Sequence, residues 1–166
     1  MGTAAAPSSL CAANSPGAVS SSPLPPALSK EHNMTTFIIP GKPFAKQRPR
    51  FSRRNGRAFT PSETISFERQ VGIIAAEHFR EPLAGPVRLK IAAVFQPPKS
   101  WSKKKTAEHM NRSHTQKPDL DNVVKAVSDG LNRIAFADDS QIAACELVKV
   151  WGPDARTVVT VEAMSA

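Results

Sequence analysis

KPDLDNVVKAVSDGLNRIAFADDSQI, residues 117–142, is the stretch of sequence on which the fold depends most. Its apolar residues recur at intervals of three and four, which predicts a helix over residues 120–136 with one buried face. Four aspartates flank this helix: Asp119 and Asp121 at its start, and Asp138 and Asp139 just after its end. The formal net charge of the 166-residue chain is +8. Two tight acidic motifs in so basic a protein point to a local function.

Regular elements are predicted on both sides of this stretch. A second helix is predicted over residues 60–79, with Thr60 or Ser62 as its N-cap. Strands are predicted for four stretches, namely residues 35–41, 87–98, 141–152 and 156–164. The last two strands are expected to form a hairpin. Gly130, inside the helix predicted over residues 120–136, costs about 1 kcal/mol relative to Ala, so it calls for a packing or functional reason. The order β-α-β-α-β-β predicts a single α+β domain, with two main helices packed on a mixed sheet.

The basic residues are concentrated in two stretches. Residues 41–57 carry seven Lys or Arg and no acid, and residues 99–117 carry six Lys or Arg against one acid. The second stretch is expected to contain a short helix around residues 101–109. Such clusters are typical of nucleic-acid binding, although a solvated, solubilising surface is the plainer alternative. The candidates for DNA binding are Lys46, Arg48, Arg50, Arg53, Arg54, Lys103, Lys104, Lys105 and Lys117.

Residues 1–33 differ in composition from the rest of the chain. Ala, Ser and Pro supply 19 of these 33 residues, which predicts a disordered leader ahead of one folded domain over residues 34–166. The leader lacks the basic and apolar regions of a secretory signal, and Met34 is an alternative start. Cys11 and Cys145 are too few for a disulfide framework or a zinc site, which favours a reducing, cytoplasmic setting. No apolar run approaches the length of a membrane span.

Each aspartate has an ordinary structural interpretation. Asp119 stands where an N-cap belongs, and Asp121 lies in a first helical turn, where the helix dipole favours negative charge. Asp138 and Asp139 suit a plain turn. Lys125 is four residues from both Asp121 and Asp129, so a salt bridge along the helix is as well supported by spacing as a catalytic role. These interpretations explain any one aspartate better than all four.

A metal site explains the aspartates together. If the strand after the helix returns beside it, Asp139 is expected to approach Asp119 and Asp121. Three adjacent carboxylates repel one another unless a cation binds them. Oxygen ligands without cysteine or histidine favour Mg²⁺, with Mn²⁺ as a substitute. A divalent metal between basic stretches suits phosphodiester hydrolysis, with the basic residues holding the phosphates.

The same residues resemble a known family. The pattern D-L-D-N-x-x-K followed by D-D-S-Q-I is similar to that of the RusA family of Holliday-junction resolvases, and the resemblance extends from Thr35 through the last strand. It implies a homodimeric, Mg²⁺-dependent endonuclease that cuts branched DNA symmetrically in recombination and repair. It also implies a bacterial or prophage protein, cytoplasmic and nucleoid-associated. The catalytic aspartates fall on Asp119, Asp121 and Asp139, which are the expected metal ligands, and the catalytic lysine falls on Lys125.

Two other classes of function remain in view. A non-catalytic junction- or DNA-binding protein on the same scaffold is the main alternative, although three acids facing phosphates would weaken such a binder. An RNA-binding module is disfavoured because the strands lack its aromatic signature. Trp101 is expected either to stack on a base or to anchor its loop. Phe44 and Phe51 suit a wedge at the branch point less well than packing in the core or a dimer contact. His109 and His114 suit phosphate contacts, or no role in the site, better than metal ligation.

Overall fold

The computed structural model describes residues 34–51 and 56–165. The predicted disordered leader, residues 1–33, lies outside the described residues, as do Arg53 and Arg54. None of the helices in the described part of the chain is long and apolar enough to cross a membrane.

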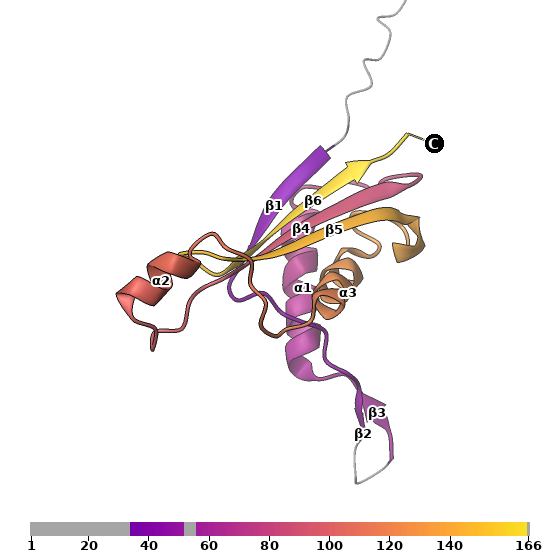
Figure 1. Ribbon diagram of the computed structural model, residues 1–166. Coiled ribbons are helices and arrows are strands. Elements are labelled where there is room, and N and C mark those ends of the chain that lie inside the picture. Colours follow the sequence, from indigo (N-terminus) through magenta and orange to yellow (C-terminus); the bar gives the residue numbers. More distant parts are fainter. Residues whose placement is uncertain (1–33, 52–55, 166) are drawn as a thin grey trace, which may run out of the picture. The chain divides into compact units, whose positions relative to one another are not determined.

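A four-stranded sheet forms the centre of the domain (Figure 1). Its strands in spatial order are β1 (Met34–Pro40), β6 (Arg156–Ala163), β4 (Val87–Phe95) and β5 (Ile142–Trp151). β6 pairs antiparallel with both β1 and β4, whereas β5 pairs parallel with β4. Alternation of apolar and polar residues along β4 and β6 buries one face of these strands, as their sequences predict. The mixed sheet confirms the predicted α+β fold.

The predicted hairpin of the last two strands is wrong, because β4 lies between β5 and β6. The chain crosses the end of β4 at Gly152, whose N–H donates to the Phe95 carbonyl at 2.9 Å. A Cβ atom at Gly152 would lie only 2.4 Å from Cγ1 of Val94. The short connection therefore passes over the end of β4 at a residue without a side chain, a crossing that local turn signals do not reveal.

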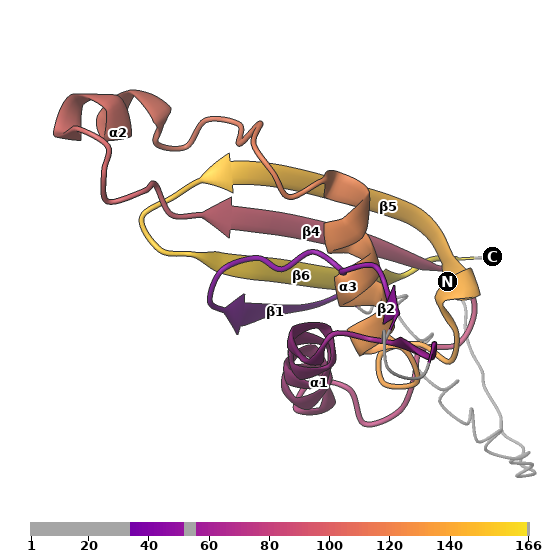
Figure 2. The same cartoon turned by 90° about the horizontal axis from the view of Figure 1, so that it is seen from below.

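Two helices, α1 (Ser62–Ala76) and α3 (Leu120–Leu131), cover one face of the sheet (Figure 2). Pro61 occupies the N-cap of α1 without a side-chain hydrogen bond, so the expected cap by Thr60 or Ser62 is not formed. α3 ends five residues before the predicted boundary at 136. Between the helices and the sheet lie fully buried apolar side chains, including Val71, Val127 and Phe136. This core is what holds α3 against the sheet.

Gly130 has the packing reason that its position in α3 called for. A Cβ atom there would lie 2.7 Å from Cβ of Val71 and 2.9 Å from the backbone oxygen of Glu68, both on α1. The absence of a side chain thus allows α1 and α3 to approach closely, and this contact fixes where α3 begins and ends relative to α1.

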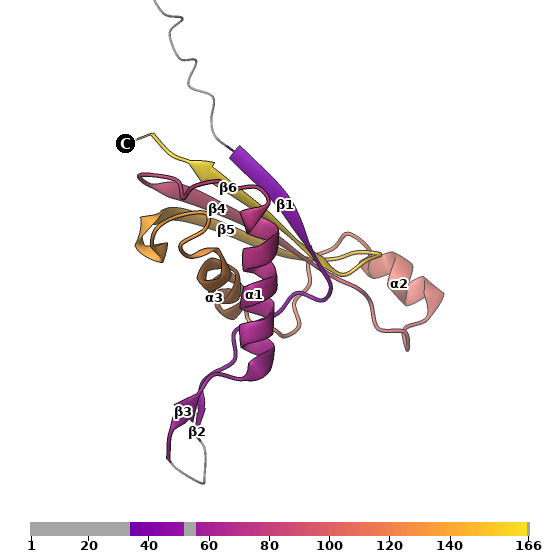
Figure 3. The same ribbon diagram turned by 180° about the vertical axis from the view of Figure 1, so that it is seen from behind.

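Two basic elements extend from this core (Figure 3). A small hairpin of β2 (Arg50–Phe51) and β3 (Ala58–Phe59), which the sequence did not predict, precedes α1 and extends away from the sheet. The short helix α2 (Lys103–His109) lies beyond the ends of β4 and β5. Part of each expected basic stretch is therefore on a protruding element, with Arg50 on the hairpin and Lys103, Lys104 and Lys105 on α2.

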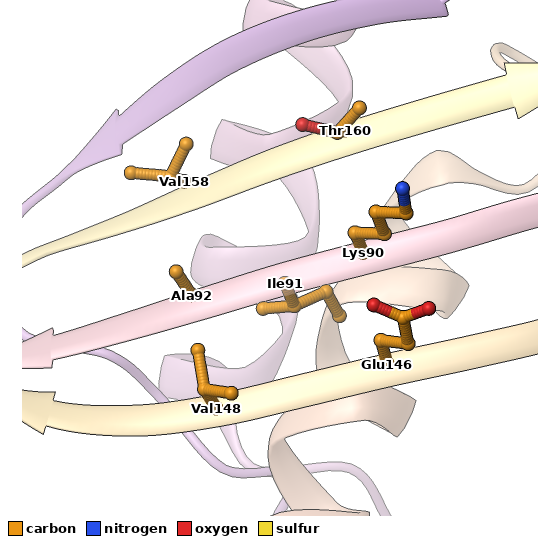
Figure 4. A pocket seen from close by; sticks show the side chains of 7 residues that line it. All are labelled: Lys90, Ile91, Ala92, Glu146, Val148, Val158 and Thr160. Atoms are coloured by element: carbon orange, nitrogen blue, oxygen red, sulfur yellow. The ribbon is translucent and has the colours of Figure 1, made fainter. Parts of the chain in front are cut away.

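The second face of the sheet carries no helix in the part of the chain that the structure describes (Figures 1 and 3). A row of apolar side chains crosses it, because Ile38 pairs with Val158, Val158 with Ala92, and Ala92 with Val148. A shallow cavity of about 150 Å³ lies beside this row, next to Lys90 and Glu146 (Figure 4). No predicted site residue lines this cavity, so the candidate site lies elsewhere.

Candidate functional site

Asp119 and Asp121 lie together at the start of α3. Asp119 occupies the N-cap position with extended backbone, but its side chain accepts no capping hydrogen bond. Asp121 is in the first turn, and its only contact among the described hydrogen bonds is a long one of 3.5 Å from the Asn122 amide. Both side chains are exposed. The N-cap interpretation of Asp119 is therefore not supported, and two carboxylates remain available to a ligand.

The structure does not bring Asp139 to these two carboxylates within one chain. α3 contains 12 residues, and at 1.5 Å per residue it separates its two ends by roughly 18 Å. Asp139 follows the far end, in a 3-10 turn (Asp139–Gln141) that Gln141 ties to the carbonyls of Leu83 and Gly85. No group of three or more His, Cys, Asp or Glu among the described residues is close enough to hold a metal ion.

The reason lies in the direction of β5. The strand does return beside α3, as the sequence suggested, but Asp139 lies before its first residue. At the end of β5, Lys149 Nζ donates to the Pro118 carbonyl at 2.7 Å. The residue of β5 that contacts the loop before Asp119 is thus Lys149. The expectation that Asp119, Asp121 and Asp139 lie close together within one chain is wrong.

The two neighbouring aspartates Asp138 and Asp139 have different roles in the structure. The Asp138 carboxylate accepts a hydrogen bond from Ser140 N at 2.9 Å and forms a capping box with Gln141. Hydrogen bonding to Ser140 lowers the pKa of Asp138. The Asp139 side chain is exposed and makes no hydrogen bond or ion pair with the described residues. Asp138 is a structural cap, and Asp139 is the member of the pair that is free to bind a ligand.

Lys125 also lacks a partner in the described part of the chain. The proposed salt bridge with Asp129 is not formed, because Asp129 pairs with Lys46, which follows β1. Lys46 Nζ also lies 3.1 Å from Oε1 of Glu68 on α1. Although burial of the ammonium opposes its charge, the carboxylates of Asp129 and Glu68 raise the pKa of Lys46. Lys125 remains exposed one turn after Asp121.

A groove of about 500 Å³ adjoins Asp119. It runs between the segment after β1 and the loop before α3, and it is lined by Lys42, Pro43, Phe44, Ala45, Lys117, Pro118, Asp119 and Asn122. Its two lysines are exposed. A hydrogen bond of 2.9 Å from Lys46 N to the Asn122 carbonyl joins the two walls. A groove with a cation on each wall and the Asp119 carboxylate in its lining suits a phosphodiester chain.

The other predicted DNA-binding residues occupy different settings. Arg48 and Arg50 are exposed near the β2–β3 hairpin, and Lys103, Lys104 and Lys105 are exposed on α2. Lys46, in contrast, is committed to its two carboxylates. The DNA contacts of these residues remain a prediction, which the geometry favours for the exposed cations and disfavours for Lys46.

The aromatic residues near α2 anchor it. Trp101 packs against Trp151 at 4.9 Å between ring centroids, and Lys105 lies 4.4 Å above the Trp101 ring. His114 is buried between Phe95 and Trp151, at centroid distances of 4.0 and 4.3 Å. Burial, aided by the charge of Lys149, lowers the pKa of His114. Trp101 therefore anchors its loop, and His114 belongs to the interior rather than to a phosphate-binding surface.

Phe44 and Phe51 differ in the same way. Phe44 is half-buried and stacks on Phe67 at 5.2 Å, as expected of a packing residue. Phe51 is 74% exposed on β2. Sequence reasoning missed Lys149, Lys42 and Asn122. For Lys149 a signal existed, because a lysine at an inward position between Leu147 and Trp151 interrupts the apolar alternation of β5.

The donor set fits a hard divalent cation in part. Asp119 and Asp121 offer exposed carboxylate oxygens without a salt bridge in the part of the chain that is described, and such oxygens are the ligands that Mg²⁺ prefers. Among the described residues, no third carboxylate lies close enough to complete the site at this end of α3. The donor chemistry therefore suits the metal, while one chain alone supplies an incomplete set of ligands.

Two comparisons relate the chain to known proteins. A family model described as Endodeoxyribonuclease RusA matches residues 40–162. An uncharacterized protein, YqaN of Bacillus subtilis (strain 168), is 36% identical over 137 residues, which cover 78% of this chain and 96% of YqaN.

Proposed function

This chain belongs to the RusA family of endodeoxyribonucleases, and from that premise we propose that it resolves four-way DNA junctions by metal-dependent hydrolysis. The observation that supports catalysis most directly is the pair of exposed carboxylates at the start of α3, Asp119 and Asp121, which make no capping hydrogen bond to the helix. A protein that only binds DNA gains nothing from such charges beside a cationic groove, because they repel phosphates. Recombination and repair are the processes in which such an activity is expected.

Each charged residue at or beside the groove has a distinct task in this proposal. Asp119 and Asp121 would hold Mg²⁺ or Mn²⁺, which when bound polarises a phosphoryl oxygen and lowers the pKa of a water molecule. Lys125, exposed and without a partner among the described residues, would donate to a non-bridging phosphate oxygen and stabilise the charge that develops during hydrolysis. Lys42 and Lys117 would hold the phosphates on either side of the cut.

The distance of Asp139 from this end of α3 supports a homodimer. β5 is an edge strand of the sheet. Loop residues 111–114 bond to its last three residues, through the backbone of Lys149 and Trp151. The outer edge from Ile142 to Val148 has no backbone partner in the described residues other than β4. Such an edge is suited to pairing with another chain.

Antiparallel pairing of two β5 edges about a two-fold axis would set the beginning of one strand beside the end of the other. The partner subunit's Asp139 would then lie near Lys149, and thus near Asp119 and Asp121. Each dimer would contain two such mixed sites related by the two-fold axis. Paired sites of this kind suit a four-way junction, which has two-fold symmetry and needs two matched cuts.

The experiment is cleavage of a synthetic four-way junction, end-labelled on each strand in turn, with Mg²⁺ or with EDTA. We expect paired cuts on two opposing strands that depend on Mg²⁺, and no cuts in linear duplex of the same sequence. Tight binding of the junction without cleavage in either Mg²⁺ or Mn²⁺ would favour the non-catalytic alternative. Equal cleavage in EDTA would exclude the metal-dependent mechanism.

A further inference from the structure

Lys149, on β5, holds the loop that leads into Asp119. Its Nζ atom donates to two backbone carbonyls of that loop, Gln116 O at 2.8 Å and Pro118 O at 2.7 Å. Its own carbonyl accepts a hydrogen bond of 2.8 Å from His114 N. The Pro118 carbonyl belongs to the peptide that directly precedes Asp119. One residue of β5 thereby fixes three points of the chain that leads into α3.

The position of Lys149 in the sheet is unusual for a lysine. It pairs with Ala93 between the pairs Ile91–Leu147 and Phe95–Trp151, on the face that the helices cover. The side chain is half-buried and forms no salt bridge with the described residues. The Lys149 ammonium is thus held by backbone carbonyls alone. An apolar side chain of similar length would fill the same place without the cost of removing a charge from water. A cation in this place is more readily explained by the carboxylates next to the loop than by stability.

We propose that Lys149 is a positioning residue for the reaction, which holds the Pro118–Asp119 peptide so that the Asp119 carboxylate is directed at the metal. The inference rests on the proposed function. Residues that orient metal ligands contribute about 10- to 100-fold to metal affinity or activity. Lys149 lies on β5, far along the chain from the two aspartates at the start of α3. A search for short sequence motifs therefore does not find it.

The test compares Lys149→Met, which keeps the length but removes the donors and the charge, with Lys149→Arg, which keeps both. Lys90→Met is the matched control, because Lys90 is a half-buried lysine of β4 on the open face of the sheet. Mn²⁺ binding is measured by calorimetry, the Mg²⁺ dependence of cleavage by rate, and folding by thermal unfolding. Lys149→Gln, which keeps a neutral donor, replaces the Met variant if that variant does not fold.

We expect Lys149→Met to weaken Mn²⁺ binding at least about tenfold, and to raise the Mg²⁺ concentration for half-maximal cleavage to match. Junction affinity without divalent metal should fall less than Mn²⁺ affinity does, and Lys149→Arg should recover most of the metal affinity. Unchanged Mn²⁺ binding with only a lower melting temperature would overturn the proposal, as would a wild-type protein that binds no Mn²⁺. Loss of Mn²⁺ binding in a protein that cuts no junction would uphold Lys149 and reject the nuclease.

Discussion

Lys46 pairs with Asp129 across the space between the segment after β1 and α3. This ion pair removes Lys46 from the set of free cations and leaves Lys125 without the helical partner that spacing offered. Both side chains are about a quarter exposed, at 27% and 21%. Replacement of Lys46 by Met should therefore lower the free energy of unfolding by about 1–2 kcal/mol, since two carboxylates lose their counterion. Urea denaturation measures it, and an unaltered midpoint would contradict the structural role.

The exposed arginines should behave in the opposite way. Arg48→Ala and Arg50→Ala should each reduce the slope of log affinity against log salt by about 0.9 on duplex DNA, because each lost phosphate contact retains one counterion. Lys46→Met is the matched control and should leave the slope unchanged. Fluorescence anisotropy over a series of salt concentrations provides the measurement. Equal slopes for all four proteins would mean that these arginines do not face DNA.

The mixed active site can be tested by complementation between two inactive proteins. Asp121→Asn and Asp139→Asn should each abolish junction cleavage, because an amide is a poor metal ligand, while junction binding persists or tightens. If each site combines residues of both subunits, a heterodimer of these two variants contains one intact site and one doubly altered site. Co-expressed, differently tagged subunits should then nick one strand of the junction.

A site built within one chain gives a different result. Both sites of the same heterodimer would then carry one substitution, and no nicking would appear. Wild-type paired with Asp121→Asn is the positive control, since it keeps one intact site in either arrangement. Sedimentation that shows only monomer at micromolar concentration, together with full resolving activity, would reject the paired-site arrangement altogether.

Because α1 and α3 approach closely at Gly130, alanine at this position is expected to lower the free energy of unfolding. Gly130→Ala should destabilise the protein by about 1–3 kcal/mol despite the better helix propensity of Ala, because the new methyl group meets Val71 and the backbone of Glu68. Gly72→Ala is the control in the same interface. Its Cβ atom would meet the Ile134 Cδ1 atom at 3.1 Å, and a side-chain end can move. Thermal unfolding should rank Gly130→Ala well below Gly72→Ala.

His114 predicts a loss of stability in acid. Burial between Phe95 and Trp151 lowers the pKa of His114 below its ordinary value of 6.5, so the unfolded chain binds a proton that the folded chain resists. Stability from this residue is therefore complete above pH 6.5 and is lost as the pH falls toward the folded pKa. His114→Phe, which keeps the ring packing, should show a smaller drop in melting temperature between pH 7 and about pH 5.

Local pattern was sufficient for most of the secondary structure. Apolar spacing over residues 120–131 and alternation along β4 and β6 require only that one face of each element be buried. The same locality explains the two short carboxylate motifs, whose members are neighbours in the chain. It also explains why the basic stretches were found without knowledge of the elements that carry them.

Contacts between segments that are distant in the chain could not be predicted from local sequence patterns. The insertion of β4 between β5 and β6 depends on a crossing at Gly152, and a strand's sequence does not state its neighbours. For the same reason, the partner of Asp129 proved to be Lys46, 83 positions away, rather than Lys125. The residue of β5 that contacts the loop before Asp119 is Lys149, whereas Asp139 lies beyond the far end of α3. Side-chain chemistry is local and can be read from residue type, whereas the meeting of two side chains depends on the packing of the whole core.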